Sequence, residues 1–162
     1  MGCDINGVLQ KREPNTNEWT TFAPIERFFD GRSYKLFGIL AGVRDQDVEV
    51  ISDQRGFPEG FECTYSNEHS HKPWPAYYPT SQGLLPLDAY IVRETWMGEH
   101  NFGWVTFREF LDYNWNQEAE DHEGNLCHLG VMFSWLHKDV YKICSDEKAH
   151  PSGIRMVFGF DS

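Results

Sequence analysis

Alternation of apolar and polar positions marks both ends of the chain as β-strands. Every second residue of 3–10 is apolar or small, and residues 154–160 repeat this period with Ile154, Met156, Phe158 and Phe160. A period of two is typical of a strand with one buried face. Turn-forming residues at 14–17 lead into a second candidate strand at 19–22. The pattern therefore predicts an N-terminal hairpin and a C-terminal strand.

Helical periodicity appears in three other stretches. Residues 33–43 carry apolar side chains at three- and four-residue spacing, with Ser33 as a candidate N-cap. Thr106 and Glu109 have the spacing of a capping box, which predicts the start of a second helix. Residues 129–144 have the longest apolar stripe and predict a third helix.

Together these elements predict an α+β fold, in which a small antiparallel sheet packs against two or three helices. The middle of the chain, about 52–103, is rich in Gly, Pro, Asn, Ser and His, with one candidate strand at 87–96. We expect ordered loops or short helical turns there, because long structureless stretches are uncommon in compact domains. We also expect a loop at His100 and an acidic, solvated break at 118–123. The length and the lack of an internal boundary predict one domain, residues 1–162.

The composition favours a folded protein and disfavours two classes of partner. Aromatic residues make up 15% of the chain, which is enough for a real core and argues against disorder. With 14 basic and 25 acidic residues the net charge is −11. Binding to a nucleic-acid backbone or an anionic membrane is disfavoured, because both need clustered Lys and Arg. The negative charge fits a basic protein partner, or it only keeps the protein soluble.

The cysteines and the N-terminus favour a cytoplasmic protein. No cysteine pair has CxxC spacing, the first residues lack a basic and apolar leader, and no apolar run could span a bilayer. We therefore expect reduced and mostly buried thiols at Cys3, Cys63, Cys127 and Cys144.

Arginines in the first third of the chain suggest an anion-binding pocket, because guanidinium groups bind phosphates and carboxylates through two parallel hydrogen bonds. Basic residues are scarce, yet Arg27, Arg32, Arg44 and Arg55 lie close in sequence. The alternative is that each arginine pairs with a neighbouring aspartate. The predicted ligand-binding residues are Arg32, Tyr34, Arg44, Arg55 and Trp104.

A metal site is the alternative chemistry. His69 and His71 would point the same way on a strand and could hold a divalent metal such as zinc, with Asp4 as a further ligand. His100 is the candidate general base, since its ordinary pKa is near neutral, and Glu109 is the second catalytic candidate. Two histidines supply only part of a zinc site, so we favour a protein that is not an enzyme and has no cofactor.

Six segments also carry a family resemblance. They are Met-Gly-Cys-Asp-Ile at 1–5, then residues 32–37, 40–44, 55–59, 100–104 with Thr106 and Glu109, and 157–162, in the same order. The chain resembles a widespread family of small phage- and prophage-encoded proteins, also found in bacterial genomes, that begin Met-Gly-Cys-Asp-Ile-His. The resemblance runs from end to end and is poorest in the middle. Asn6 replaces the usual His, and Asn101 and Gly103 replace small hydroxyl residues. If the family uses that His as a ligand or base, this chain lacks it, which argues against metal catalysis.

The resemblance implies a phage-type accessory protein that acts in the host cytoplasm. Small acidic phage proteins often neutralise a host defence system, by capping a defence protein or by sequestering its nucleotide messenger. We therefore expect a binding protein whose partner is a host defence protein or a small nucleotide signal. The alternatives are a metal-dependent hydrolase or nuclease that uses His69, His71 and His100, and a virion or host-takeover interaction module. The sequence is compatible with a homo-oligomer.

Overall fold

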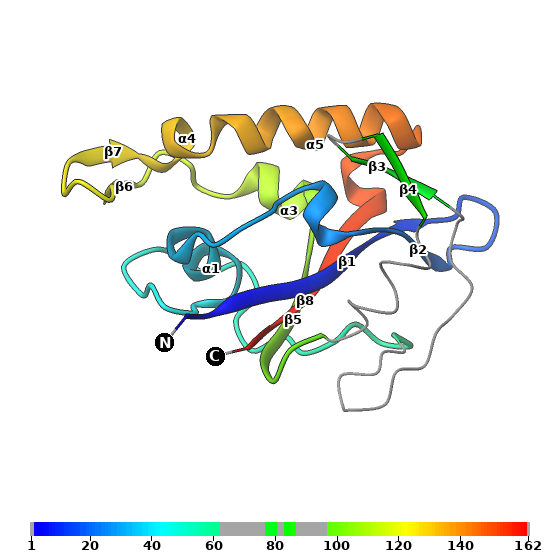
Figure 1. Ribbon diagram of the computed structural model, residues 1–162, viewed down its shortest axis with the longest axis horizontal. Helices are drawn as coiled ribbons and strands as arrows, with labels where there is room; N and C mark the ends of the chain where they lie inside the picture. Colours follow the sequence, from blue (N-terminus) through cyan, green and yellow to red (C-terminus); the bar gives the residue numbers. More distant parts are fainter. Residues whose placement is uncertain (1, 62–76, 81–82, 87–96, 162) are drawn as a thin grey trace.

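The computed structural model describes residues 2–61, 77–80, 83–86 and 97–161 (Figure 1). Its main sheet has four antiparallel strands in the order β2-β1-β8-β5. These strands are β1 (Asp4–Arg12), β2 (Trp19–Pro24), β5 (His100–Thr106) and β8 (Ile154–Asp161). The predicted α+β fold, with the N-terminal hairpin and the C-terminal strand in one sheet, is confirmed.

The remaining elements are short helices, one long helix and two small hairpins. The helices are η1 (Ile25–Arg27), α1 (Tyr34–Ala41), α3 (Phe107–Asp112), α4 (Leu129–Met132), α5 (Ser134–Glu147) and η2 (Pro151–Gly153). The hairpins pair β3 (Tyr77–Thr80) with β4 (Gly83–Pro86), and β6 (Glu118–Glu120) with β7 (Leu126–His128).

Helices α1, α3 and α5 lie on one side of the sheet, and the main core fills the space between them (Figure 1). The period-two pattern supplies the sheet side of this core, because alternate residues of a strand face the same way. The sheet contributes Ile5, Leu9, Met156, Phe158 and Phe160, and the helices contribute Leu36, Phe37, Phe107, Phe110, Leu136 and Val140, all buried.

The opposite face of the sheet carries a smaller apolar cluster. Val8 and Val157 face each other across β1 and β8 and pack with Met97, Phe57 and Trp104. The chain around Met97 approaches β8 so closely that a Cβ on Gly159 would overlap the Met97 carbonyl oxygen. Glycine at this position therefore permits the contact.

Both predicted helix starts are confirmed. The Ser33 hydroxyl accepts a hydrogen bond from the Leu36 backbone N–H at the start of α1. Thr106 and Glu109 form the predicted capping box at the start of α3.

Four local predictions differ from the structure. The middle segment, expected to hold loops or short helical turns, includes the β3–β4 hairpin. The predicted helix 129–144 is divided at Phe133, whose φ of −113° and ψ of 22° interrupt the helix between α4 and α5. His100 begins strand β5 rather than lying in a loop, and a register shift between His100 and Gly103 hides the period of two. Residues 118–123, expected to be a solvated break, include strand β6. The strand has a period of two, with Ala119 buried between exposed Glu118 and Glu120. The candidate strand at 87–96 lies outside the described residues.

Of the three cysteines in the described ranges, Cys3 and Cys144 are buried free thiols, as predicted, whereas Cys127 is partly exposed. Burial raises the pKa of the Cys144 thiol above its ordinary value.

Candidate functional site

Guanidinium and indole groups alternate across the face of the sheet that lies away from the helices. The Arg12 guanidinium carbon lies 5.7 Å from the centre of the Trp19 ring, and that of Arg155 lies 4.1 Å from the same ring. Arg155 is also 5.8 Å from the centre of the Trp104 ring, and Arg55 lies 4.5 Å from Trp104. We call Arg12, Trp19, Arg155, Trp104 and Arg55 the arginine–tryptophan ladder.

Strand pairing places the ladder residues side by side. Arg12 on β1 pairs with Trp19 on β2, and Arg155 on β8 pairs with Gln10 on one side and with Thr106 on the other. Trp104 lies two residues before Thr106 and so faces the same way. Cation–π contacts contribute roughly 0.5–1 kcal/mol at exposed sites and more when they are desolvated, so the ladder is also a structural brace.

Arg155 is the unusual member of the ladder. Only 7% of its surface is exposed, and its Nε donates a hydrogen bond of 2.9 Å to Oε1 of Gln10. Gln10 in turn donates to the Thr21 hydroxyl, which fixes the orientation of its amide. Burial lowers the pKa of Arg155 to about 10, because the charged form loses hydration. No carboxylate of the described residues forms an ion pair with Arg155, and no described group accepts a hydrogen bond from its two terminal nitrogens.

Arg55, at the other end of the ladder, is fully engaged. Its two terminal nitrogens donate to the two Glu109 carboxylate oxygens at 2.9 and 2.8 Å, and also to the carbonyl oxygens of Trp104 and Ile51. Burial alone would raise the pKa of Glu109, but hydrogen bonds from Arg55 and from the Thr106 backbone outweigh burial and lower it. Glu109 is thus a capping residue and an ion-pair partner in this structure, and Arg55 holds the Trp104 ring in place.

The other predicted ligand-binding residues meet at the end of the sheet where β1 begins. Arg32 forms a two-point ion pair with Asp4, and both side chains are about half exposed, at 54% and 50%. The Tyr34 hydroxyl accepts a hydrogen bond from the Cys3 backbone N–H, and the Arg44 guanidinium lies 5.7 Å from the centre of the Tyr34 ring. We call Cys3, Asp4, Arg32, Tyr34 and Arg44 the sheet-end cluster.

Electrostatics in the sheet-end cluster are already balanced locally. The hydrogen bonds from Arg32 lower the pKa of the Asp4 carboxyl and raise that of the Arg32 guanidinium. Burial raises the pKa of the Cys3 thiol, although a hydrogen bond from Arg44 acts in the opposite direction. A buried thiol with a raised pKa is a poor nucleophile, so this cluster does not have the properties of a cysteine active site.

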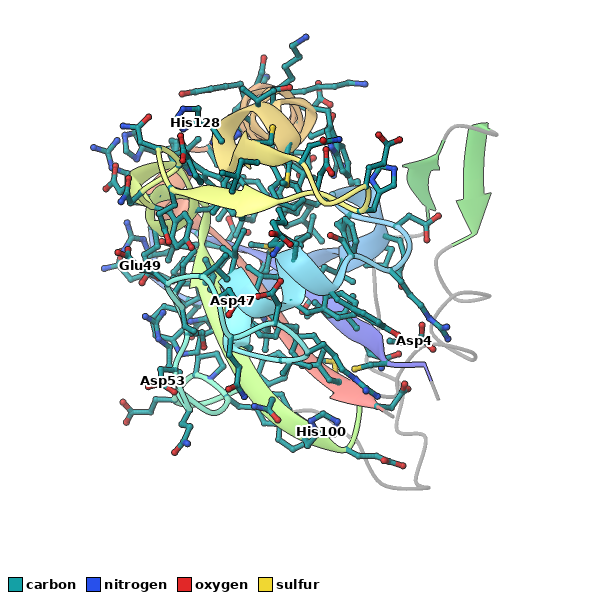
Figure 2. The ribbon with its side chains drawn as sticks, turned by 90° about the vertical axis from the view of Figure 1, so that its left-hand side faces the viewer. Asp4, Asp47, Glu49, Asp53, His100 and His128 are labelled. Atoms are coloured by element: carbon teal, nitrogen blue, oxygen red, sulfur yellow. The ribbon has the colours of Figure 1, made fainter. Side chains whose placement is uncertain are left out.

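The predicted ligand-binding set is therefore divided between two places. Figure 2 shows Asp4 and Asp53, which lies two residues before Arg55, on opposite sides of α1. The structure brings Arg32, Tyr34 and Arg44 together and places Arg55 with Trp104 in the ladder. Arg32 and Arg55 each form an ion pair with a carboxylate, as the alternative interpretation expected. Their partners, Asp4 and Glu109, are distant in sequence rather than neighbouring aspartates.

The candidates for metal and acid–base chemistry do not gather in the described residues. His100 stacks on Phe160 with ring centres 6.3 Å apart, and its Nδ1 lies 2.7 Å from Oδ1 of Asn101 (Figure 2). Within the described ranges, no three His, Cys, Asp or Glu side chains come close enough to hold a metal ion. His69 and His71 lie outside those ranges.

Sequence reasoning missed three ladder residues, although the signals were present. Arg155 occupies a polar position of the strand predicted at 154–160, between apolar neighbours, and Trp19 begins the predicted second strand. A charged residue at a polar strand position is usually exposed, so its burial between indoles depends on the pairing of β1, β2, β5 and β8.

Comparison with known proteins does not assign the chain to a family. No protein-family model matches the chain, and neither a curated protein nor a solved structure is significantly similar to it. None of the helices in the described part combines the length and the apolar character that a membrane span requires.

Proposed function

We propose that the protein is a binding protein without catalytic activity, which takes up a small, planar, nucleotide-like anion on the arginine–tryptophan ladder. The observation that carries this proposal is Arg155: a nearly buried guanidinium, held between two indole rings, without an ion-pair partner among the described residues. Buried charges in proteins are ordinarily paired, so a guanidinium of this kind is suited to an anionic ligand.

The ladder offers both chemical features that a nucleotide needs. Indole faces stack on bases with little preference for their identity, and each such contact is worth about 1–3 kcal/mol. The free nitrogens of Arg155 can donate to phosphate oxygens, with Arg12 exposed beside them at the outer end of the ladder. Arg55 serves as a positioning residue, because its guanidinium is committed to Glu109 and braces Trp104.

The net charge of −11 supports a small ligand rather than a polymer. A long phosphate backbone would meet repulsion over most of the surface, whereas a single small anion needs only local positive charge. The resemblance to phage-encoded proteins supports one biological role for such binding, the sequestration of a nucleotide messenger of host defence. Capping of a defence protein is the competing role.

The test is binding of a panel of nucleotides, linear and cyclic, measured by calorimetry with the purified protein. We expect one ligand per chain for the preferred nucleotide, and at least a tenfold weaker Kd in Arg155→Lys, because lysine lacks the two-point fork. Trp19→Leu should also weaken binding by about tenfold, since one stacked base contact is worth 1–3 kcal/mol. Arg108→Gln is the matched control: it removes an exposed guanidinium on α3 that pairs with Asp112.

Recovery of the ligand after denaturation of the complex separates sequestration from catalysis. A sequestering protein returns the nucleotide intact, whereas a hydrolase returns products. Failure of every nucleotide to bind, or equal affinity of Arg155→Lys, Trp19→Leu and the control, would refute the proposal.

A further inference from the structure

Exposed apolar side chains gather along one edge of the molecule. Five large hydrophobic residues of the described ranges are exposed, and four of them lie between residues 126 and 141. These are Leu126 on β7 (70%), Val131 on α4 (67%), and Trp135 (46%) and Tyr141 (61%) on α5. Single exposed apolar residues are ordinary, but a concentration of this kind marks an interaction surface.

The outward face of α5 is apolar and basic. The helical period of 3.6 places Lys138 and Lys142 between the rings of Trp135 and Tyr141, and all four are exposed. The exposed serines 134 and 145 complete this face, and no acidic residue lies at its centre. In a chain of net charge −11, a helix face of this composition is suited to an acidic partner.

The β6–β7 hairpin presents the opposite charge at the other end of the same edge. Its pairing of Glu118 with His128 and of Glu120 with Leu126 puts these four exposed residues on one face, while Ala119 is buried on the other. Residues 118–128 contain four acidic residues and no Lys or Arg. Figure 1 shows the hairpin, α4 and α5 in a row along one side of the molecule.

We infer that this hairpin–helix edge, which consists of Glu118, Glu120, Leu126, Val131 and the outward face of α5, binds the same edge of a second copy of the chain. The row has an acidic end at the hairpin and a basic end at Lys138 and Lys142, with exposed Val131 and Trp135 between the two, and such an order of charges is self-complementary. A two-fold axis across the centre lays the hairpin of one protomer along the basic part of α5 of its partner, and makes each contact twice. Val131 and Trp135, which lie between the acidic and the basic end, are then nearest the axis and pack against their copies in the partner.

Charge complementarity favours a second copy over an unrelated partner. A purely acidic partner would meet repulsion from the hairpin, and a purely basic partner would meet repulsion from Lys138 and Lys142. The antiparallel copy supplies both charges in the required order. The ladder lies on the far face of the sheet from the helices, so a dimer of this kind leaves it uncovered.

Sedimentation equilibrium of the full chain over a range of concentrations and salt tests the inference. We expect a monomer–dimer equilibrium that weakens as salt rises, because exposed ion pairs are screened. Glu120→Lys and Lys142→Glu should each weaken the dimer about tenfold or more, because symmetry replaces two attractions by two repulsions. The double variant restores opposite charges and should recover most of the affinity, at the native net charge.

Glu59→Lys is the matched control, since Glu59 is exposed in the turn that follows Arg55 and changes the net charge by the same amount as Glu120→Lys. A chain that stays monomeric at every concentration would overturn the inference. So would a dimer that neither charge reversal weakens, or a double variant that is weaker than both single variants. Far-UV circular dichroism of each variant checks that the fold is retained.

Discussion

Glu109 links the start of α3 to the ladder, and its replacement gives the sharpest test of the local energetics. Its Oε1 accepts a hydrogen bond of 3.1 Å from the Thr106 backbone N–H, and both carboxylate oxygens accept from Arg55. Glu109→Ala removes both contacts. Loss of the capping interaction costs about 1 kcal/mol, and loss of a partly exposed ion pair costs about 0.2–1 kcal/mol. We therefore expect the free energy of unfolding to fall by about 1.2–2 kcal/mol.

Glu109→Gln separates the two contributions. Its amide oxygen can still accept from the Thr106 N–H, since Gln also serves in capping boxes, so only the charged interaction with Arg55 is weakened. We expect this variant to lose about half as much stability as Glu109→Ala. Asp112→Ala is the control on the same helix, because it breaks an exposed ion pair with Arg108 that is worth only about 0.3–0.5 kcal/mol.

The same residue predicts a pH dependence with a definite sign. The pKa of Glu109 is lower in the folded protein than its ordinary value of 4.5. A carboxylate with a lowered pKa adds stability above its unfolded pKa and loses that stability as the pH falls through the folded pKa. The stability gap between the native protein and Glu109→Gln should thus be full at pH 7 and shrink below about pH 4.5.

Urea unfolding followed by tryptophan fluorescence measures these differences, with equal m-values as evidence that the midpoints can be compared. The reasoning fails if Glu109→Ala costs no more than Asp112→Ala. It also fails if the gap between the native protein and Glu109→Gln is the same at pH 7 and at pH 3.

Three further predictions concern other parts of the fold. Ser33→Ala should lower stability by about 1 kcal/mol in urea unfolding, because α1 loses its N-cap hydrogen bond. Gly159→Ala should be strongly destabilising in the same assay, since its Cβ would overlap a backbone carbonyl, whereas Gly153→Ala meets no atom within 4 Å and should be tolerated. An NMR titration should find the pKa of Asp4 below its ordinary value of 3.8, and Arg32→Gln should return it toward that value.

The parts of the fold that follow from local periodicity could be predicted from sequence. Strands β1, β2 and β8, helix α1 and the capping box of α3 each have a signal within a few residues. Strand β5 could not, because Asn101, with a φ of 51°, lies within its register shift and breaks the alternation. The interruption of the helix at Phe133 could not be predicted either, because the apolar residues keep their helical spacing on both sides of it.

The site was predictable only in part, because its residues depend on partners far away in sequence. Arg55 meets Glu109 across 54 positions, and Arg155 meets Gln10 across 145. The sequence predicted that the arginines of the first third lie together, because basic residues are scarce. The strand order separates these arginines into two places, which the sequence could not indicate. Among the described residues, Arg155 is a nearly buried guanidinium without an ion-pair partner, and sequence reasoning did not select it.

The strand order also constrains when the protein can fold during its synthesis. The first strand and the last strand, β1 and β8, pair along nearly their whole length at the centre of the sheet, from Asp4 with Asp161 to Lys11 with Ile154. During synthesis, the edge of β1 that pairs with β8 therefore stays unpaired until β8 has left the ribosome. An unpaired edge of this kind is open to wrong partners, and pairing over such a separation is slow. Chains stalled shortly before residue 154 should thus be the species that chaperones retain.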